Sequence, residues 1–111
     1  MTTPETALLG KLLDLSVQRQ QTLATNIANA NTPGYVRQRI LFDEALKRAA
    51  GDSSAAGLAA VEPDYSHPPR TDGNNVNLGK ELGELTQNGV YHQLVSRALS
   101  TKMRIYHQAI G

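Results

Sequence analysis

Hydrophobic residues recur at helical spacing in the first third of the chain. Drawn at about 100° per residue, they fall on one half of a helical wheel and polar residues fall on the other half. The apolar half contains Leu8, Leu9, Leu12, Leu13, Leu15, Leu23, Ala24 and Ile27. Pro4 suits a first helical turn, Thr3 can cap it, and Pro33 disfavours helical dihedrals at Thr32. The pattern predicts a helix over residues 4–31.

The last third shows the same periodicity and predicts a helix over residues 76–110. Its apolar positions divide between two faces that are rotated by roughly 100° on a straight wheel. The first face holds Leu78, Leu82 and Leu85, and the second holds Val95, Leu99, Met103, Tyr106 and Ile110. The change falls at Asn88, Gly89 and Val90, so the helix either bends there or winds around a partner.

The middle of the chain, residues 32–75, shows no sustained periodicity. Residues 35–40 could form a short strand and residues 42–50 two turns of helix. The small-residue stretch 51–57 has no pattern, and Pro63, Pro68 and Pro69 exclude helix further on. We therefore expect a long loop or insert, either flexible or ordered against neighbours.

These elements predict an all-α fold in a single domain, residues 1–111, whose two long terminal helices pack as a coiled-coil hairpin. The chain has no Trp, one Phe and four Tyr among 111 residues, so its core should be thin. Two helices cannot close a core, and the outer flanks of the hairpin should remain partly apolar. Association with copies of itself or with similar helices is the physical consequence.

The amino-acid composition argues against several classes of function. The formal net charge of +1 gives no electrostatic reason for binding nucleic acid, and the absence of cysteine excludes a disulfide framework. The N-terminal residues lack the basic start of a secretory signal peptide, and we expect no cleavable signal. No apolar stretch is long enough to span a bilayer.

Catalytic, metal and cofactor sites find no support in the motifs. His92 and His107 lie roughly 22 Å apart on one helix, too far to share an ion, and His67 is remote from both in sequence. No nucleophile elbow, phosphate-binding glycine loop or zincin helix is present. We expect no enzyme, no cofactor, no metal and no small-molecule substrate.

Scattered charges and a small turn complete the middle segment. Its basic residues are interleaved with acids, which favours solvated charge or salt bridges between subunits over a nucleic-acid site. They are Arg37, Arg39, Lys47, Arg48 and Arg70. Residues 72–75 read as a turn, with Asn75 or Asn77 capping the following helix.

The most informative stretch is residues 24–35, where the first helix ends. Asn26 and Asn29 lie one turn apart and can hydrogen-bond neighbouring main chain or each other. Pro33 and Gly34 stand at the second and third positions of a turn that ends at Tyr35, which favours type II. From the physics alone, an ordinary helix end is an equally good explanation.

This stretch resembles the N-terminal signature of flagellar rod and hook proteins, in which a long helix ends in an Asn-Ile/Leu-Ala-Asn-Ala sequence and a turn. The matching positions that we assign to the family motif are Asn26, Ile27, Ala28, Asn29, Pro33, Gly34 and Tyr35. Residues 72–78 and 87–95 resemble the start and the middle of the C-terminal helix in B-type subunits of the proximal rod. Gly79 and Gly89 depart from that pattern, which would place helix-favouring residues there.

The resemblance implies a structural subunit of the bacterial flagellar basal-body rod, exported unfolded by the type III apparatus and assembled in the periplasm. Its implied partners are other rod subunits and the membrane-ring or export-gate adaptor at the rod base, in homo- and hetero-oligomers. The side chains that we expect in helix packing are Leu8, Leu12, Leu23, Leu82, Leu85, Val95, Leu99 and Tyr106. The alternative is a soluble helical-hairpin adaptor, similar to an export chaperone, that binds one partner.

Overall fold

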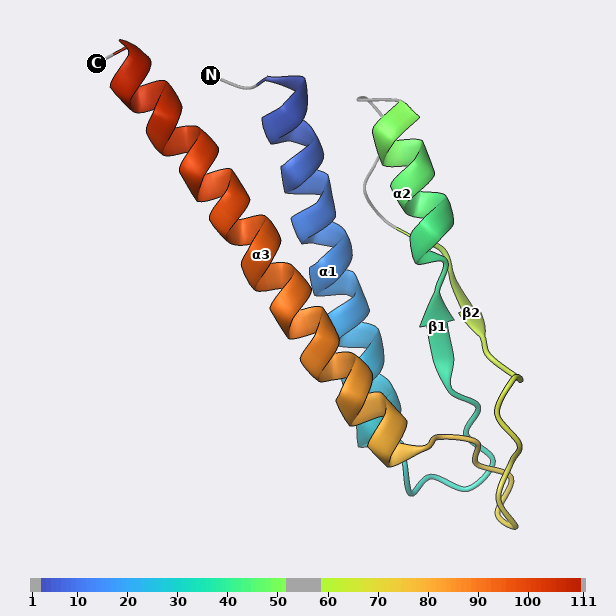
Figure 1. The fold of residues 1–111 in the computed structure, drawn as a ribbon. Helices are drawn as coiled ribbons and strands as arrows, with labels where there is room; N and C mark the ends of the chain where they lie inside the picture. The colour runs from blue at the N-terminus through green and yellow to red at the C-terminus, as the bar shows by residue number, and fades with distance from the viewer. Residues whose placement is uncertain (1–2, 52–58, 111) are drawn as a thin grey trace.

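Two long helices run side by side in opposite directions, and a strand–helix–strand segment packs along the first of them (Figure 1). The computed structural model describes residues 3–51 and 59–110. In chain order the elements are α1 (Pro4–Ala28), β1 (Gln38–Ile40), α2 (Phe42–Gly51), β2 (Val61–Pro63) and α3 (Leu78–Ile110). The molecule is elongated, with principal extents of 62 × 24 × 15 Å.

Helix α1 starts where the sequence predicts. Thr3 is the N-cap: its Oγ1 accepts the Thr6 N–H, and Thr6 Oγ1 accepts the Thr3 N–H in return, which satisfies two backbone donors that the helix cannot. Pro4 occupies the first turn. The helix ends at Ala28 with Asn29 as C-cap, slightly earlier than the predicted residue 31, because the chain already turns away through 29–32.

The middle segment is more regular than expected. The predicted short strand and short helix are present, but β2 was not expected, and it pairs antiparallel with β1 in the register Arg39↔Glu62. Leu15 of α1, Ala45 of α2 and Ala59 form a small buried cluster. Leu12, Ile40 and Phe42 pack against that cluster. Most of the small-residue stretch 51–57 lies outside the described residues.

Helix α3 is hydrogen-bonded without a break from Leu78 to Ile110, through Gly89. It begins two residues later than predicted because Asn77 caps it, with Oδ1 accepting the Lys80 N–H at 3.1 Å. The described ends of α1 and α3 that are nearest the two termini lie at the same end of the molecule (Figure 1). The connections from α1 to β1 and from β2 to α3 lie at the opposite end.

The core is thin, and polar side chains share it. Among the described residues, the buried apolar side chains are Leu15, Leu23, Ala45, Ala49, Ala59, Val76 and Val95. The buried polar ones are Thr6, Ser16, Asn26, Arg37, Asp64, Asn74, Asn75, Glu81 and Asn88. The polar set includes an ion network, so the stability of this fold depends on the pairing of these groups as well as on apolar burial.

Candidate assembly site

The family motif at the end of α1 is organised around Asn26, which is fully buried. Its Oδ1 accepts the Gln38 N–H at 2.8 Å and the Tyr35 hydroxyl at 3.0 Å. Its Nδ2 donates to the Gln38 carbonyl at 2.8 Å and to Glu81 Oε2 at 3.2 Å. One side chain therefore joins α1, β1 and α3.

The predicted turn after α1 is confirmed. The Tyr35 N–H donates to the Thr32 carbonyl at 3.2 Å, and Gly34 has φ +74°, as the third position of a type II turn requires. A second turn lies against it: the Gly34 N–H donates to the Asp72 carbonyl at 2.8 Å. A Cβ on Gly73, whose φ is +83°, would come within 3.3 Å of the Gly34 Cα. Gly73 therefore serves both its own turn and the close approach of the two turns.

Asn74 holds the turn that follows α1, although it lies 45 residues after Asn29 in the chain. Its Nδ2 donates to the carbonyls of Asn29, Ala30 and Thr32 at 2.9, 3.1 and 2.8 Å. Its Oδ1 accepts the Val76 N–H at 2.8 Å. These carbonyls lie just after Ala28, the last residue of α1, so this buried amide satisfies them and fixes the loop before α3 against the turn that follows α1.

Arg37 carries the densest set of charges in the fold. Its guanidinium pairs with Asp64, with Glu81 through Nε at 2.5 Å, and with Glu84 through Nη2 at 3.4 Å. Arg37 and Asp64 are buried, and Glu81 is fully buried. Asn75 supports the cluster: its Oδ1 accepts the Arg37 N–H, and its Nδ2 donates to the Asp64 carbonyl, each at 2.7 Å.

Burial and pairing act in opposite directions on these groups. Burial by itself lowers the pKa of Arg37, but the hydrogen bond and charge of Glu81, with Asp64 and Glu84, outweigh it and the pKa is raised. Burial raises the pKa of Asp64, but hydrogen bonds from Ser66 and Arg37 outweigh it and lower the pKa to about 2. Both groups are therefore charged across the physiological pH range.

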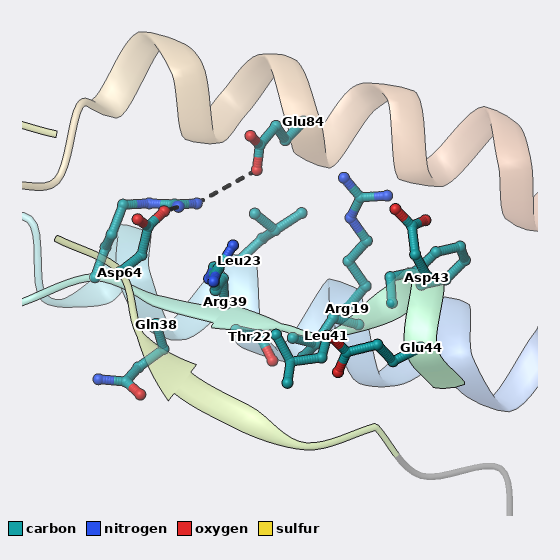
Figure 2. A pocket seen from close by; sticks show the side chains of 13 residues that line it. Arg19, Thr22, Leu23, Gln38, Arg39, Leu41, Asp43, Glu44, Asp64 and Glu84 are labelled. Carbon is teal, nitrogen blue, oxygen red and sulfur yellow. Dashed lines mark hydrogen bonds and ion pairs between the residues drawn. The ribbon is translucent and has the colours of Figure 1, made fainter. Parts of the chain in front are cut away.

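A hollow of about 420 Å³ opens between α1, β1, the start of α2 and α3 (Figure 2). The dashed line in Figure 2 marks the Arg37–Glu84 pair, which crosses one side of it. Near the start of α2, the Arg19 guanidinium lies 5.4 Å from the centroid of the Phe42 ring. The lining carries charges of both signs, including Arg39, Asp43 and Glu44, and favours no single class of ligand.

Polar pairs set the register of α1 against α3. Asn26 meets Glu81, Ser16 meets His92 at 2.7 Å, and Glu5 meets Lys102 at 2.5 Å. Asn88 Nδ2 donates to the Ser16 carbonyl and to Gln20 Oε1, each at 2.8 Å. In nearly all these pairs the two residue numbers add to 107 or 108, as a fixed antiparallel register requires. Hydrogen-bonded polar groups, together with Leu23 and Val95, therefore hold this seam.

The residues predicted to pack between helices divide into three groups. Leu23 and Val95 are buried. Half-buried are Leu8, Leu12, Leu85, Leu99 and Tyr106. Leu82 is 47% exposed, although the fully buried Glu81 precedes it directly, so in the single chain the Leu82 side chain lies off the side of the C-terminal helix that faces α1.

The family-motif residues also divide by burial. Asn26 is buried, and Ile27, Asn29 and Tyr35 are half-buried. Ala28, Pro33 and Gly34 are exposed. Asn29 bonds locally: its Nδ2 donates to the Thr25 carbonyl at 2.9 Å, and its Oδ1 accepts the Thr32 hydroxyl at 3.2 Å.

Sequence reasoning missed the network around Arg37. We expected the basic residues of the middle segment to be solvated or to pair between subunits, but Arg37 is buried and its ion pairs lie within the chain. Arg39 pairs with Glu62 across the two strands, and Arg70 donates to the carbonyls of Ala30 and Val76. Only the density of asparagine at residues 74–77 could have signalled a buried polar junction.

Other kinds of site are not apparent in the described part of the chain. No three acidic or histidine side chains there gather closely enough to hold a metal ion. None of its helices combines the length and the apolar character needed to cross a membrane.

Comparison with known proteins shows which protein family this chain resembles. Residues 16–35, which end at the turn that Asn26 holds, match the family model described as flagella basal body rod protein. The chain is 33% identical to the flagellar basal body rod protein FlgB of Escherichia coli K12 over 113 aligned positions, covering 83% of this chain and 82% of that protein. FlgB of Borrelia hermsii is 30% identical over 106 positions, with 76% and 78% covered. FlgB of Bacillus subtilis 168 is 28% identical over 102 positions, with 76% and 75% covered.

Proposed function

This chain belongs to the flagellar basal body rod protein family, and we propose that it builds the proximal part of the rod by packing its terminal helices against those of neighbouring subunits. It is a structural subunit of that rod. The proposal treats residues 1–111 as one rod-type domain. In the rod, the α1/α3 hairpin forms a coiled-coil layer with the hairpins of other subunits.

The observation that carries the proposal is the apolar surface of α3. Six large apolar side chains spread over the helix are at least 47% exposed: Leu78, Leu82, Val90, Leu94, Ile105 and Ile110. Large apolar side chains at this density on one helix mark an interaction surface. The fold hides polar groups in the α1/α3 seam and leaves these apolar groups outside, which suits a chain completed by its neighbours.

The finer parts of the proposal follow from this role. The chain is exported through the type III apparatus and assembles in the periplasm. Its neighbours are copies of itself, other rod subunits and the adaptor at the membrane ring or export gate. The absence of cysteine and the thin apolar core suit a chain that travels unfolded and gains stability when partners cover it.

The test compares two acidic substitutions at equally exposed apolar positions. Leu82 on α3 and Val61 on β2 are 47% and 49% exposed, so Leu82→Asp and Val61→Asp should both fold as single chains. In cells that lack their own copy of the protein, Leu82→Asp should abolish swimming because a charge enters the packed helix face. Val61→Asp should retain most of it. Leu12 is unsuitable for this comparison because it packs against the buried cluster, where an acid would test folding.

Normal swimming by the Leu82→Asp strain would contradict packing through this face of α3. Sedimentation of concentrated purified protein separates the alternative function. A rod subunit with different contact surfaces on its two sides forms open polymers of increasing length. A hairpin adaptor forms a closed oligomer or a one-to-one complex, and that result would favour the adaptor.

A further inference from the structure

The side of the α1/α3 pair that faces away from Phe42 and Tyr91 carries a groove. A hollow of about 390 Å³ lies between the two helices, midway along α1. We call it the seam groove, and it is lined by Ser16, Val17, Gln20, Gln21, Asn88, Gly89, His92 and Gln93. A Cβ on Gly89 would meet nothing within 4 Å. The groove is therefore deeper at Gly89 than it would be with a larger residue there.

One hydrogen-bond acceptor at the seam groove, the Asn88 Oδ1 atom, receives no hydrogen bond from the described residues. Asn88 is almost fully buried, and its Nδ2 makes two hydrogen bonds, but its Oδ1 has no partner among the described residues. A buried acceptor left in this state costs roughly 1–3 kcal/mol. Glutamine side chains offer further acceptors along the groove, and Asp14 adds an exposed anion one turn before Val17 on the same side of α1. The groove is therefore suited to a partner that carries apolar side chains and a donor cation.

The same molecule presents such a surface elsewhere on α3. Val90, Leu94 and Arg97 follow the i, i+4, i+7 spacing of one helix face, and all three are exposed. They lie roughly 180–240° around the helix from Asn88, which faces α1, so they point away from the hairpin. We call this the knob face. No ion pair to Arg97 is recorded among the described residues.

We propose that the seam groove of one copy receives the knob face of α3 from a second copy of this chain. The inference rests on the proposed function and names the contact that such assembly uses. Val90 and Leu94 cover the apolar floor at Gly89 and Val17, and the Arg97 guanidinium supplies donors to the acceptor-rich wall and a charge opposite Asp14. The groove and the knob face lie on different sides of the molecule. The contact is therefore heterologous, and it adds copies without closing a ring unless the rotation happens to close.

Two variants block one surface each and leave the fold intact. Gly89→Leu fills the groove, where there is open space, and replaces a poor helix former, so the single chain should become more stable. Leu94→Glu places a charge on the knob face at a position that is 62% exposed. Matched controls are Ala50→Leu, which adds bulk to α2, and Tyr65→Glu, which adds an acid at a 76% exposed loop position.

Sedimentation velocity over a range of concentrations gives the readout. Each blocked variant alone should require at least tenfold more protein than wild type to form chains longer than two copies, and the two controls should behave as wild type. An equimolar mixture of the blocked variants should form two-copy complexes that grow no further. The intact knob of one then fits the intact groove of the other, while both remaining surfaces are blocked.

The other outcomes of this experiment contradict the groove–knob contact, and they differ in what they imply for the proposed function. If wild type forms polymers and either blocked variant does so equally well, the groove–knob contact is overturned while the proposed function stands. If both variants lose growth but their mixture yields no two-copy complex, the two surfaces do not meet, and the contact is again overturned. If wild type stays a single chain at every concentration, self-assembly fails, and this inference fails with it.

Discussion

Arg37 and Glu81 form a buried ion pair whose members depend on each other. Glu81 is fully buried, and besides Arg37 its hydrogen-bond partner is the Asn26 amide at 3.2 Å. Taking two charges from water is costly, and the attraction between them repays that cost only when both are present. The pair ties the residue directly before β1 to α3, and it acts more as a condition of folding than as a net source of stability.

The substitution that tests this dependence most directly is Arg37→Met. It puts an unbranched apolar side chain in place of the guanidinium and leaves Glu81 as a buried anion without its ion-pair partner. We expect it to lower the free energy of unfolding by about 3–5 kcal/mol. The double variant Arg37→Met/Glu81→Met removes the stranded Glu81 carboxylate but still leaves the buried Asp64 without Arg37, so it should recover only the part of that loss that comes from Glu81. Urea unfolding of dilute protein measures both. Equal destabilisation by the single and the double variant would mean that the cost does not come from the stranded carboxylate.

At the scale of elements, sequence patterns predicted what depends on local chemistry. Thr3 and Pro4 marked the start of α1, Pro33 and Gly34 marked the turn after it, and periodicity located both long helices. The second strand was not predicted, because its three residues owe their conformation to pairing with β1.

The seam between α1 and α3 was predicted least well. Hydrophobic periodicity assigned its inner face to leucines, whereas Glu81 and Asn88 are buried and Leu82 is exposed. Burial of Glu81 depends on Arg37, which lies 44 residues earlier in the chain. Periodicity within one helix carries no information about a partner at that distance. The same reason hid the buried Asn74, whose partners lie at the end of α1.

Asn74 tests how the two long helices are joined. Asn74→Ala removes the donors to the carbonyls of the turn that follows α1, and we expect a loss of roughly 1–3 kcal/mol, with faster amide hydrogen exchange in that turn. Asn74→Asp retains an oxygen for the Val76 N–H but brings a negative charge to the same carbonyls, so it should be at least as damaging. Tolerance of Asp would show that the side chain serves its own turn through Val76 and not the turn that follows α1.

At the scale of the whole molecule, the α1/α3 seam departs from the usual distribution of side chains. The α1/α3 seam contains Ser16, Asn26, Glu81 and Asn88, while large apolar groups such as Leu82 stand outside. Polar contacts give the seam a single register, since a shift by one residue would leave buried donors and acceptors unpaired. The exposed apolar groups remain available for neighbours. One helix pair can thus fix its own geometry and still offer the surfaces from which a rod is built.

This distribution predicts that the stability of the protein depends on its concentration. Each tenfold increase in the range where copies associate should stabilise the folded chain by about 1.4 kcal/mol, because association removes only folded molecules from the unfolding equilibrium. For a chain of this size that corresponds to a rise in Tm of about 5 °C. Circular dichroism melts over a hundredfold range of concentration measure it, and Leu94→Glu, which blocks the knob face, should flatten the dependence. A Tm that stays constant over that range for wild type would mean that the exposed leucines of α3 are not covered by sister molecules.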